Sequence, residues 1–278
     1  MDSIFKQQEL LEFWRSVIDP NCIGMPEAIA KDISSYTNEP IDLVLQKMET
    51  GKEDLKRLWD TLCINKSDPN CVEMFYKYQF IEAYDLANWH CGRENGIPPL
   101  NYAYAAKFAQ RKNLNRVLDF GSGIGTGSMC LASIGCEVHA ADIAQELLSF
   151  LGYRLEQKHF PVNLINLSRG DKPQIHYYDL ITCFDVLEHI PDQLSKLREL
   201  ESYLCNGGYL LVNFLNNSTD YERPMHISSA GNWLSIVRRT NMYPEWSSCF
   251  GSTQSLRRAR HARFRNTLAL WIEYIKIL

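Results

Sequence analysis

The sequence has no long apolar run and no marked excess of charge of either sign. Its most apolar windows, YLLVNFL and the charge-interrupted LALWIEYIKIL, fall short of the roughly 20 apolar residues that cross a bilayer. The 29 basic and 33 acidic residues nearly cancel, and such a balance does not favour binding to a nucleic-acid backbone. The composition therefore predicts a protein without a membrane partner, and its net charge gives no support for a nucleic-acid partner; we expect a small-molecule substrate.

Closely spaced cysteine pairs are also missing, although nine cysteines lie between Cys22 and Cys249. An odd number of cysteines without a C-x-x-C pair fits neither a disulfide framework nor a zinc site. The first residues, MDSIFKQQELLEFW, lack the basic start and the uninterrupted apolar core of a secretory signal. We therefore expect a cytoplasmic protein that holds no metal.

Two regions with different hydrophobic periodicity follow one another. Up to about residue 112, apolar residues recur at helical spacing, as in LKRLWDTL, and the turn-forming stretches DPN, NEP, SDPN and GIPPL separate at least four helices. The longest of these is expected over CVEMFYKYQFIEAYDLANWH. From Arg116, short apolar runs alternate with helical segments, which is typical of a parallel sheet with crossover helices. The pattern predicts a helical lid over 1–112 and an α/β core over 113–278.

The core should contain seven strands. We expect them at RVLDF, EVHAA, VNLINL, DLITCF, YLLVNF, EWSSCF and LALWIEYI, with helices over residues 125–133, 144–158, 193–203 and 229–239. Five strand–helix alternations would then end in two strands that a polar loop joins. This order predicts a doubly wound, Rossmann-like sheet of seven strands.

The stretch VLDFGSGIGTGS, residues 117–128, carries glycines at alternate positions directly after the first predicted strand. In a doubly wound sheet this turn cradles the ligand. The dinucleotide fingerprint G-x-G-x-x-G is not completed, because Thr126 or Ser128 stands where its third glycine is required. A Walker-type phosphate loop is excluded because no Gly-Lys-Ser/Thr follows. The turn is therefore suited to a ligand other than these phosphate esters.

Two carboxylates define that ligand further. Asp119 stands two residues before the turn, where it would oppose a pyrophosphate by on the order of several kcal/mol but would attract a cation. Asp142 ends the second predicted strand, a little over 20 residues later, where an acidic side chain accepts hydrogen bonds from ribose hydroxyls. The expected ligand is cationic and resembles a nucleoside.

These motifs, with YDLITCFDVLEHIPD and NGGYLLVNF, resemble the class I S-adenosylmethionine-dependent methyltransferases over about residues 116–214. The resemblance implies an enzyme that binds S-adenosylmethionine and releases S-adenosylhomocysteine. It also implies a site for each part of the cofactor: Asp119, Gly121, Ser122, Gly123 and Gly125 for the methionine portion, Asp142 for the ribose, Ile143 for the adenine, and Phe184 and Asp185 for the sulfonium and adenine side. Many members have an acidic residue after the third strand, where NLINLSRGD offers Asn166 or Ser168.

Methyl transfer from a sulfonium is an in-line displacement, so the protein must align the acceptor and give its proton somewhere to go. Candidate groups follow the fourth and fifth strands: Glu188 and His189 in DVLEHIPD, and Glu222 and His226 in DYERPMHIS. A histidine is largely neutral at cellular pH and accepts a proton there. We take His226 as the first candidate for the base, with His189 and Glu188 beside it.

The aromatic residues of the N-terminal region indicate how the acceptor is bound. Tyr78, Trp89 and Tyr102 are expected to contact the substrate, since ring faces favour a cationic acceptor. With Glu188 and Glu222 they favour N-methylation of an amine metabolite in a specialised biosynthetic route. The alternatives are an O-methyltransferase of a small hydroxylated metabolite, an RNA methyltransferase that uses RRARHARFR, and a cofactor-binding partner subunit without activity. The sequence leaves the oligomeric state open.

Overall fold

The computed structural model describes residues 6–62, 65, 68–77, 80–94, 96–213, 224–226, 233–245 and 253–259. The strands in these residues are β1 (Arg116–Phe120), β2 (Glu137–Asp142), β3 (Val162–Asn166), β4 (Tyr178–Cys183), β5 (Leu204–Asn213), β6 (Met242–Pro244) and β7 (Thr253–Arg258). They form one sheet in the order β3-β2-β1-β4-β5-β7-β6. Strand β7 runs antiparallel to both of its neighbours, and the other pairs are parallel. The predicted doubly wound sheet of seven strands is confirmed.

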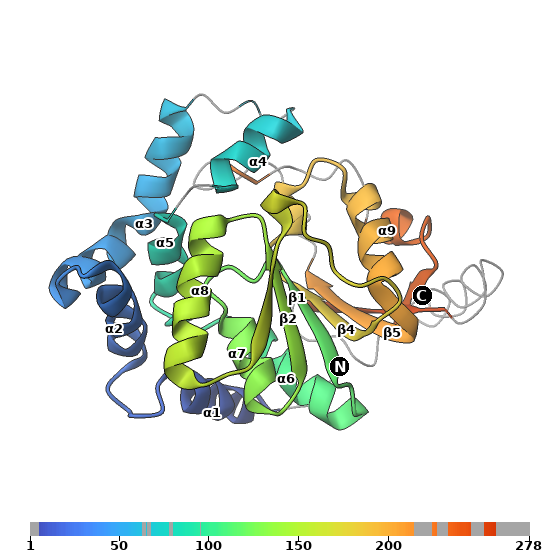
Figure 1. Cartoon of the computed structure of the whole chain (residues 1–278), viewed down its shortest axis with the longest axis horizontal. Coiled ribbons are helices and arrows are strands. Elements are labelled where there is room, and N and C mark those ends of the chain that lie inside the picture. Colours follow the sequence, from blue (N-terminus) through green and yellow to red (C-terminus); the bar gives the residue numbers. More distant parts are fainter. Residues whose placement is uncertain are drawn as a thin grey trace.

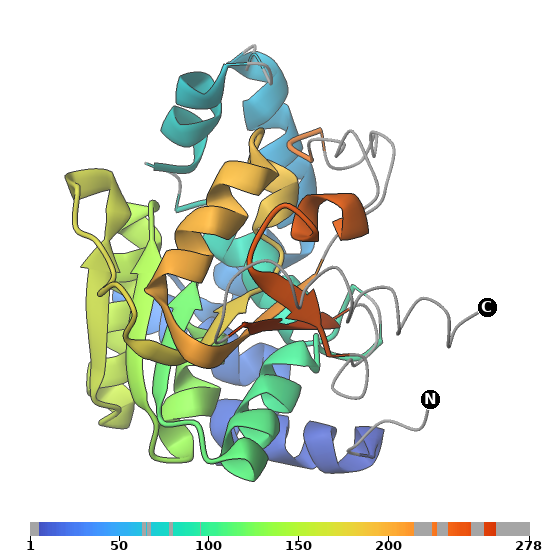
Figure 2. The same cartoon turned by 90° about the vertical axis from the view of Figure 1, so that its right-hand side faces the viewer.

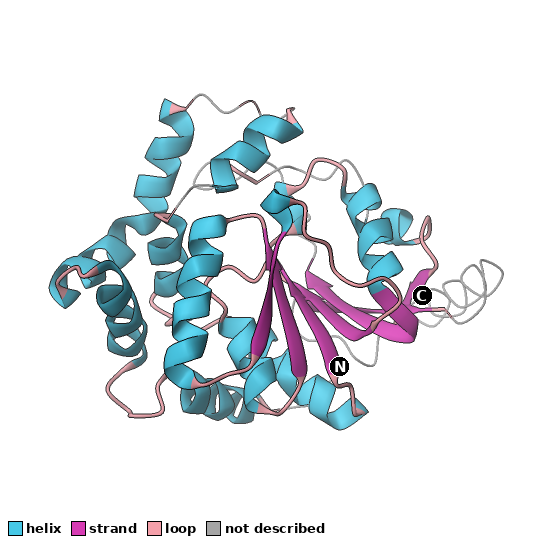
Figure 3. Cartoon of the chain, in the orientation of Figure 1, coloured by secondary structure: helices cyan, strands magenta, loops and turns pink. Residues whose placement is uncertain are grey.

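Helices cover both faces of this sheet (Figure 3). The N-terminal helices are α1 (Gln7–Ile18), α2 (Met25–Thr37), α3 (Ile41–Thr61), α4 (Pro69–Lys77), α5 (Glu82–His90) and α6 (Asn101–Lys112). Between and after the strands come α7 (Thr126–Ser133), α8 (Gln145–Lys158), α9 (Gln193–Tyr203) and α10 (Trp233–Val237), with 3-10 turns η1 (Leu167–Arg169) and η2 (Leu187–His189). No helix in the described ranges is both long enough and apolar enough to span a membrane.

The central strands bury side chains on both faces, as parallel strands between two helical layers do. Val117 of β1 and Leu180 of β4 belong to a core shared with α1, α2 and α5 to α8. Leu118 and Ile181, the next residues along the same strands, belong to a second core with α9 and α10. Figure 1 shows α8 and α9 on opposite sides of the sheet.

The last two strands do not lie where the sequence pattern places them. The stretch EWSSCF begins at Glu245, just after β6, and its remaining residues, like all of LALWIEYI, fall outside the described residues. Strand β7 has the sequence TQSLRR, and its inward side chains include the fully buried Ser255 and the nearly buried Thr253. Small buried hydroxyl residues give no apolar signal, so the pattern missed this strand. The basic run RRARHARFR begins as the last two residues of β7.

The stretch CVEMFYKYQFIEAYDLANWH, expected as one long helix, contains two helices instead. Helix α4 ends at Lys77 and α5 begins at Glu82, so α3, with 21 residues, is the longest described N-terminal helix. Phe80 lies at the break and packs its ring 5.6 Å from that of Tyr36 and 5.7 Å from that of Phe150. The aromatic side chain that looked helical in the sequence is drawn into the core between α2 and α8.

A buried arginine joins the N-terminal helices to the sheet. Arg154 of α8 is fully buried, and its Nε donates to Asp32 Oδ2 of α2 at 3.0 Å. Its Nη1 donates to the carbonyl of Ile124 at 2.6 Å, in the turn after β1. The helices before residue 112 therefore pack as part of the same core, and the division into a lid and a core domain stays a prediction.

The end of α3 and helix α4 stand over the carboxyl ends of the central strands, whereas α1 lies at the opposite end of the molecule (Figure 1, Figure 2). A small apolar cluster of Trp59, Phe75 and Tyr76 also includes Met225, from the chain after β5. This cluster holds α4 and the segment 224–226 together above the sheet.

Candidate active site

A cavity of about 610 Å³ lies at the carboxyl ends of β1, β2 and β4. This volume is in the range of sites that enclose small-molecule ligands. The sheet and the N-terminal helices both contribute to the wall, with Gly121, Ser122, Gly123, Asp142, Ile143, Phe184, Asp185 and His189 from the sheet side and Tyr76, Trp89, His90 and Tyr102 from the helices. The predicted cofactor residues thus lie mostly on one cavity.

The turn after β1 exposes backbone to this cavity. Gly121 has a φ of 74°, and the N–H groups of Gly121 and Ser122 both donate to the carbonyl of Ala141 in β2. The Oγ of Ser122 is buried on the cavity wall and has no hydrogen-bond partner in the described part of the chain. A buried hydroxyl of this kind is suited to a polar ligand group.

Gly125 does not lie on the cavity wall and serves packing instead. Its φ is 81°, and a Cβ built there would lie 1.8 Å from Cδ1 of Leu151 in α8. We expect Gly125→Ala to lower the free energy of unfolding by about 2–4 kcal/mol, from left-handed strain plus displacement of Leu151. Gly135→Ala is the matched control because its φ is 86° and nothing lies within 4 Å of its Cβ. Denaturation in urea that gives equal costs for both variants would contradict this packing role.

Asp119 lies beneath the glycine turn and not on the cavity wall. It is 3% exposed, and its two oxygens accept from Ser128 Oγ at 2.7 Å and from Thr182 Oγ1 at 2.8 Å. Burial raises the pKa of its carboxyl above the ordinary 3.8, against the opposing effect of the two hydroxyls. Any action on a cofactor therefore passes through its charge and through the turn that it supports.

The raised pKa of Asp119 predicts how stability depends on pH. Between pH 3.8 and the folded pKa, the unfolded chain binds fewer protons than the folded one, so the wild-type free energy of unfolding falls as pH rises through that window. Asp119→Asn removes this loss and keeps partners for both hydroxyls. We expect the stability of the variant relative to the wild type to be higher at pH 7 than at pH 4, measured by urea denaturation. An unchanged difference would contradict a buried, destabilised carboxylate.

Asp142 lies on the cavity wall at the end of β2. Its Oδ2 accepts from the N–H of Gly123 at 2.8 Å and its Oδ1 accepts from the N–H of Ala144 at 2.9 Å. It thus fixes the glycine turn and the start of α8 together, and burial raises its pKa. A carboxylate oxygen accepts more than one hydrogen bond. Asp142 can therefore hold its two backbone partners and still accept from ribose hydroxyls.

The segment after β3 differs from the sequence prediction. Asn166 accepts from Ser168 through its Oδ1, at 3.1 Å from the backbone nitrogen and 2.7 Å from Oγ, and neither residue lies on the cavity wall. Asp171 lies on the wall, and its Oδ2 accepts from the backbone N–H of Asn166 at 3.2 Å. Asp171 is the last residue of NLINLSRGD, and the 3-10 turn η1 before it returns the chain to the cavity wall.

Phe184 and Asp185 lie on the wall directly after β4, as predicted. The backbone N–H of Asp185 donates to Oδ1 of Asn213 at 2.7 Å, and Nδ2 of Asn213 donates to Oδ1 of Asp185 at 2.6 Å. This reciprocal pair holds Asp185 at a φ of 55°. Asn213 had no role in the sequence analysis, although a buried amide that ends the apolar run YLLVN is a signal for such a function.

The N-terminal helices add aromatic side chains to the cavity wall beside the glycine turn, where Tyr102 lies against Gly127 and His90 against Thr126. Trp89 and Tyr102 lie on the cavity as predicted, and the ring of Tyr102 is 5.4 Å from that of Phe184. His90, beside them, is 2% exposed, and burial lowers its pKa to about 3. Its Nδ1 is 2.8 Å from Thr126 Oγ1, and its Nε2 is buried without a hydrogen-bond partner in the described residues. A neutral imidazole here is suited to a polar group of the ligand.

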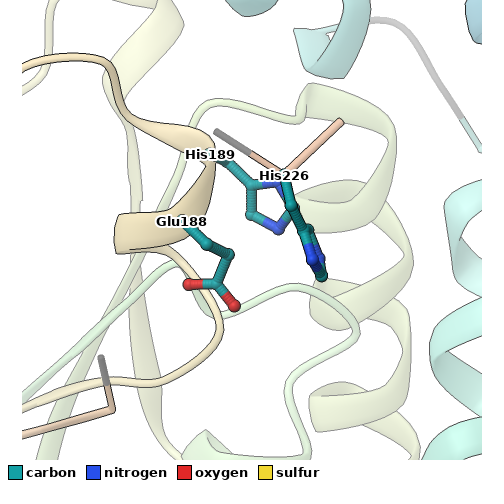
Figure 4. A group of neighbouring side chains, drawn as sticks. All are labelled: Glu188, His189 and His226. Carbon is teal, nitrogen blue, oxygen red and sulfur yellow. The ribbon is translucent and has the colours of Figure 1, made fainter. Parts of the chain in front are cut away.

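The three predicted catalytic residues come together from two separate segments. Glu188 and His189 form the 3-10 turn η2, and His226 belongs to the segment 224–226. Their ligand atoms lie within 4.8 Å of one another, and the two imidazole rings are 5.1 Å apart (Figure 4). Nδ1 of His189 lies 2.7 Å from the Tyr76 hydroxyl of α4. Of the three, only His189 is on the wall of the cavity.

Two predicted substrate contacts, Tyr78 and Glu222, lie outside the described residues.

The mixed sheet, the glycine turn and the two acidic residues that support it define an S-adenosylmethionine-dependent methyltransferase of class I. The residues fit this cofactor, since Ser122 Oγ of the turn and His90 Nε2 of α5 are buried polar atoms on the cavity wall without a hydrogen-bond partner among the described residues. Residues 98–268 match the model of a methyltransferase domain. The chain belongs to this family, and it is an enzyme.

Among curated relatives, a protein called ubiquinone biosynthesis O-methyltransferase from Hydrogenovibrio crunogenus is 30% identical over 129 residues, covering 46% of this chain and 53% of that protein. A protein of the same name from Xanthomonas campestris pv. campestris is 36% identical over 107 residues, covering 37% and 44%. The chain thus spans about half the length of the curated relatives it matches. Among solved structures, StiE O-MT has a TM-score of 0.49 at 16% identity, covering 67% of this chain and 84% of that chain.

Proposed function

We propose that this enzyme transfers a methyl group to the hydroxyl oxygen of a small aromatic molecule. The observation that carries the proposal is His189, an imidazole on the cavity wall that the hydroxyl of Tyr76 holds at 2.7 Å. The relatives called O-methyltransferases support the same acceptor atom. The aromatic side chains of Trp89, Tyr102 and Phe184 on the wall suit a flat acceptor.

Bound S-adenosylmethionine supplies an electrophilic methyl group. A neutral hydroxyl is a weak nucleophile, so its proton must leave before or during the transfer. When Nδ1–H of His189 donates to Tyr76 Oη, the other ring nitrogen, Nε2, carries the lone pair that accepts this proton. Glu188, 3% exposed beside the ring, stabilises the resulting charge.

The sequence favoured an amine acceptor, but the structure gives less support to the carboxylates on which that prediction depended. That reading assigned Glu188 and Glu222 to a protonated amine. Glu188 is not on the cavity wall, and Glu222 is not among the described residues. The hydroxyl acceptor, which was the alternative, now has more support.

A matched acceptor series tests the proposal. Catechol, 2-aminophenol and 1,2-diaminobenzene have the same shape and differ only in the acceptor atoms. The enzyme is incubated with S-adenosylmethionine carrying a ¹³C-labelled methyl group, and the product is identified by its carbon shift. We expect an O-methyl product from catechol and from 2-aminophenol. We expect no methylated product from the diamine. Methylation confined to nitrogen would overturn the proposal.

A lid role for α4 and α5 predicts a change in hydrogen exchange on cofactor binding. Trp89 and His90 of α5 and Tyr76 of α4 line the cavity, so a ligand there should lower the opening rate of these helices. We expect slower exchange in peptides from residues 70–104 when S-adenosylhomocysteine is added. Peptides from α1, at the far end of the molecule, are the control (Figure 2). Equal exchange with and without ligand over residues 70–104 would rule out the lid.

A further inference from the structure

The cluster of Glu188, His189 and His226 has the composition of a metal site. Figure 4 shows the carboxylate and the two imidazole rings gathered in one place, and their ligand atoms lie within 4.8 Å of one another. The residues come from η2 and from the segment after β5, so the fold, rather than local sequence, brings them together. The convergence of donors from separate segments is the first observation.

The surroundings of His189 are a second, independent observation. A histidine that binds a metal through one ring nitrogen commonly has the other nitrogen held by a hydrogen bond, which fixes the ring orientation. In His189 the Tyr76 hydroxyl lies 2.7 Å from Nδ1, so a metal ion would bind this ring through Nε2. Tyr76 is itself buried, in the apolar cluster with Trp59, Phe75 and Met225. The buried Tyr76 hydroxyl therefore fixes the orientation of the His189 ring.

The burial of Glu188 suits a cation as a further partner. Glu188 is only 3% exposed, and a positive charge beside a buried carboxylate stabilises it. A divalent ion bound by both imidazoles supplies two positive charges at this point. Met225, which precedes His226 in the chain, is 3% exposed, and its burial anchors the backbone next to His226.

We propose that Glu188, His189 and His226 bind one divalent transition-metal ion at the edge of the cofactor cavity. Two imidazoles and one carboxylate favour Zn²⁺ over Mg²⁺ or Ca²⁺, which prefer oxygen ligands. Metal–ligand bonds of about 2.1 Å put the ligand atoms about 3.4 Å apart in a tetrahedral site. The side chains therefore draw together by up to about 1.4 Å from their present separation of up to 4.8 Å.

The role of the ion rests on the proposed O-methylation, whereas its binding does not. With three protein ligands, the ion keeps a position open for the acceptor oxygen. With the ion bound, Nε2 of His189 would be a ligand and would no longer accept the proton. The acceptor O–H bond would therefore break with its proton passing to solvent water, because an oxygen on a divalent ion loses its proton more readily. The oxygen then forms its bond to the methyl carbon as the carbon–sulfur bond breaks, and the electron pair stays on the sulfur.

Metal binding is tested without any acceptor. The protein is freed of metal with a chelator, dialysed and titrated with Co²⁺, whose visible absorption reports tetrahedral ligation, and with Zn²⁺ in a calorimeter. We expect one ion per chain, and we expect His189→Ala, His226→Ala and Glu188→Gln each to weaken binding at least tenfold. His159→Asn is the control, because His159 ends α8 in the left-handed region that asparagine tolerates and is outside the cluster.

A crystal of the wild-type protein soaked in Zn²⁺ gives a result that does not depend on how the variants fold. Anomalous scattering at the zinc edge should place the ion between the three side chains. Absence of an ion there, or titration curves that the three substitutions leave unchanged, would overturn the metal site. Methylation of catechol by the metal-free enzyme at the full rate would leave the proposed function standing and overturn the role of the ion. Metal binding without methylation of any hydroxyl would overturn the proposed function alone.

Discussion

His189→Gln is expected to lower turnover by about 10²- to 10⁴-fold at saturating S-adenosylmethionine, the usual range for a group that handles a proton. Of the three candidates it is the residue on the cavity wall, and its ring is oriented by Tyr76. The loss should appear in kcat, because the group acts in the transition state and not in cofactor binding. The same loss is expected whether Nε2 takes the proton directly or binds an ion that lowers the pKa of the acceptor.

The comparison of His189 with His226 refines this prediction. The sequence made His226 the first candidate, and the structure places it beside His189 but not on the cavity wall. We expect His226→Gln to lose at least tenfold but less than His189→Gln. Tyr76→Phe should lose activity in kcat with unchanged cofactor affinity, because the ring then lacks its hydrogen bond. Turnover at the wild-type level in His189→Gln would remove His189 from the mechanism.

Asp142→Ala is expected to weaken S-adenosylmethionine binding by about 1–3 kcal/mol, or roughly 5- to 150-fold in Kd. The substitution removes the acceptor for the ribose hydroxyls. It also leaves the N–H groups of Gly123 and Ala144 without their partner, so the glycine turn is no longer fixed. Isothermal titration calorimetry measures the change.

Asp171→Asn is the matched comparison for Asp142, since both carboxylates lie on the cavity wall. Asp171 is exposed to solvent, whereas Asp142 is only 8% exposed. Water therefore screens a hydrogen bond to Asp142 less than one to Asp171. We expect the Asp171 substitution to change cofactor affinity less than the Asp142 substitution does. A folded Asp142→Ala variant with the wild-type Kd would contradict the cofactor pocket.

The cofactor side of the site could be predicted because its signals are local. The glycine turn, Asp119 and Asp142 stand within a single strand–turn–helix–strand unit, where spacing along the chain fixes position in the fold. Asn166 stays a prediction, but the structure places it off the cavity wall, because η1 folds the chain back and brings Asp171, a few residues later, to the wall. A three-residue turn is too short to show a hydrophobic periodicity, so the sequence pattern did not predict this change of chain direction.

The acceptor side could be predicted only in part. The sequence predicted Glu188, His189 and His226 as catalytic residues because such groups suit proton transfer, and the structure brings them together, while their catalytic role stays a prediction. The sequence did not predict the orientation of each side chain, since successive residues of the 3-10 turn η2 point about 120° apart. Glu188 and His189 are adjacent in sequence and belong to the same cluster, yet of the two only His189 lies on the cavity wall, so Glu188 is not placed to hold an amine there.

A crystal structure with S-adenosylhomocysteine would show whether the cavity is the cofactor site. We expect the nucleoside in the cavity, with its ribose hydroxyls about 2.6–3.2 Å from the carboxylate of Asp142 and its sulfur on the side of His189. Calorimetry on the same sample should give one molecule bound per chain. A nucleoside bound away from Asp142, or no binding at millimolar ligand, would contradict this expectation.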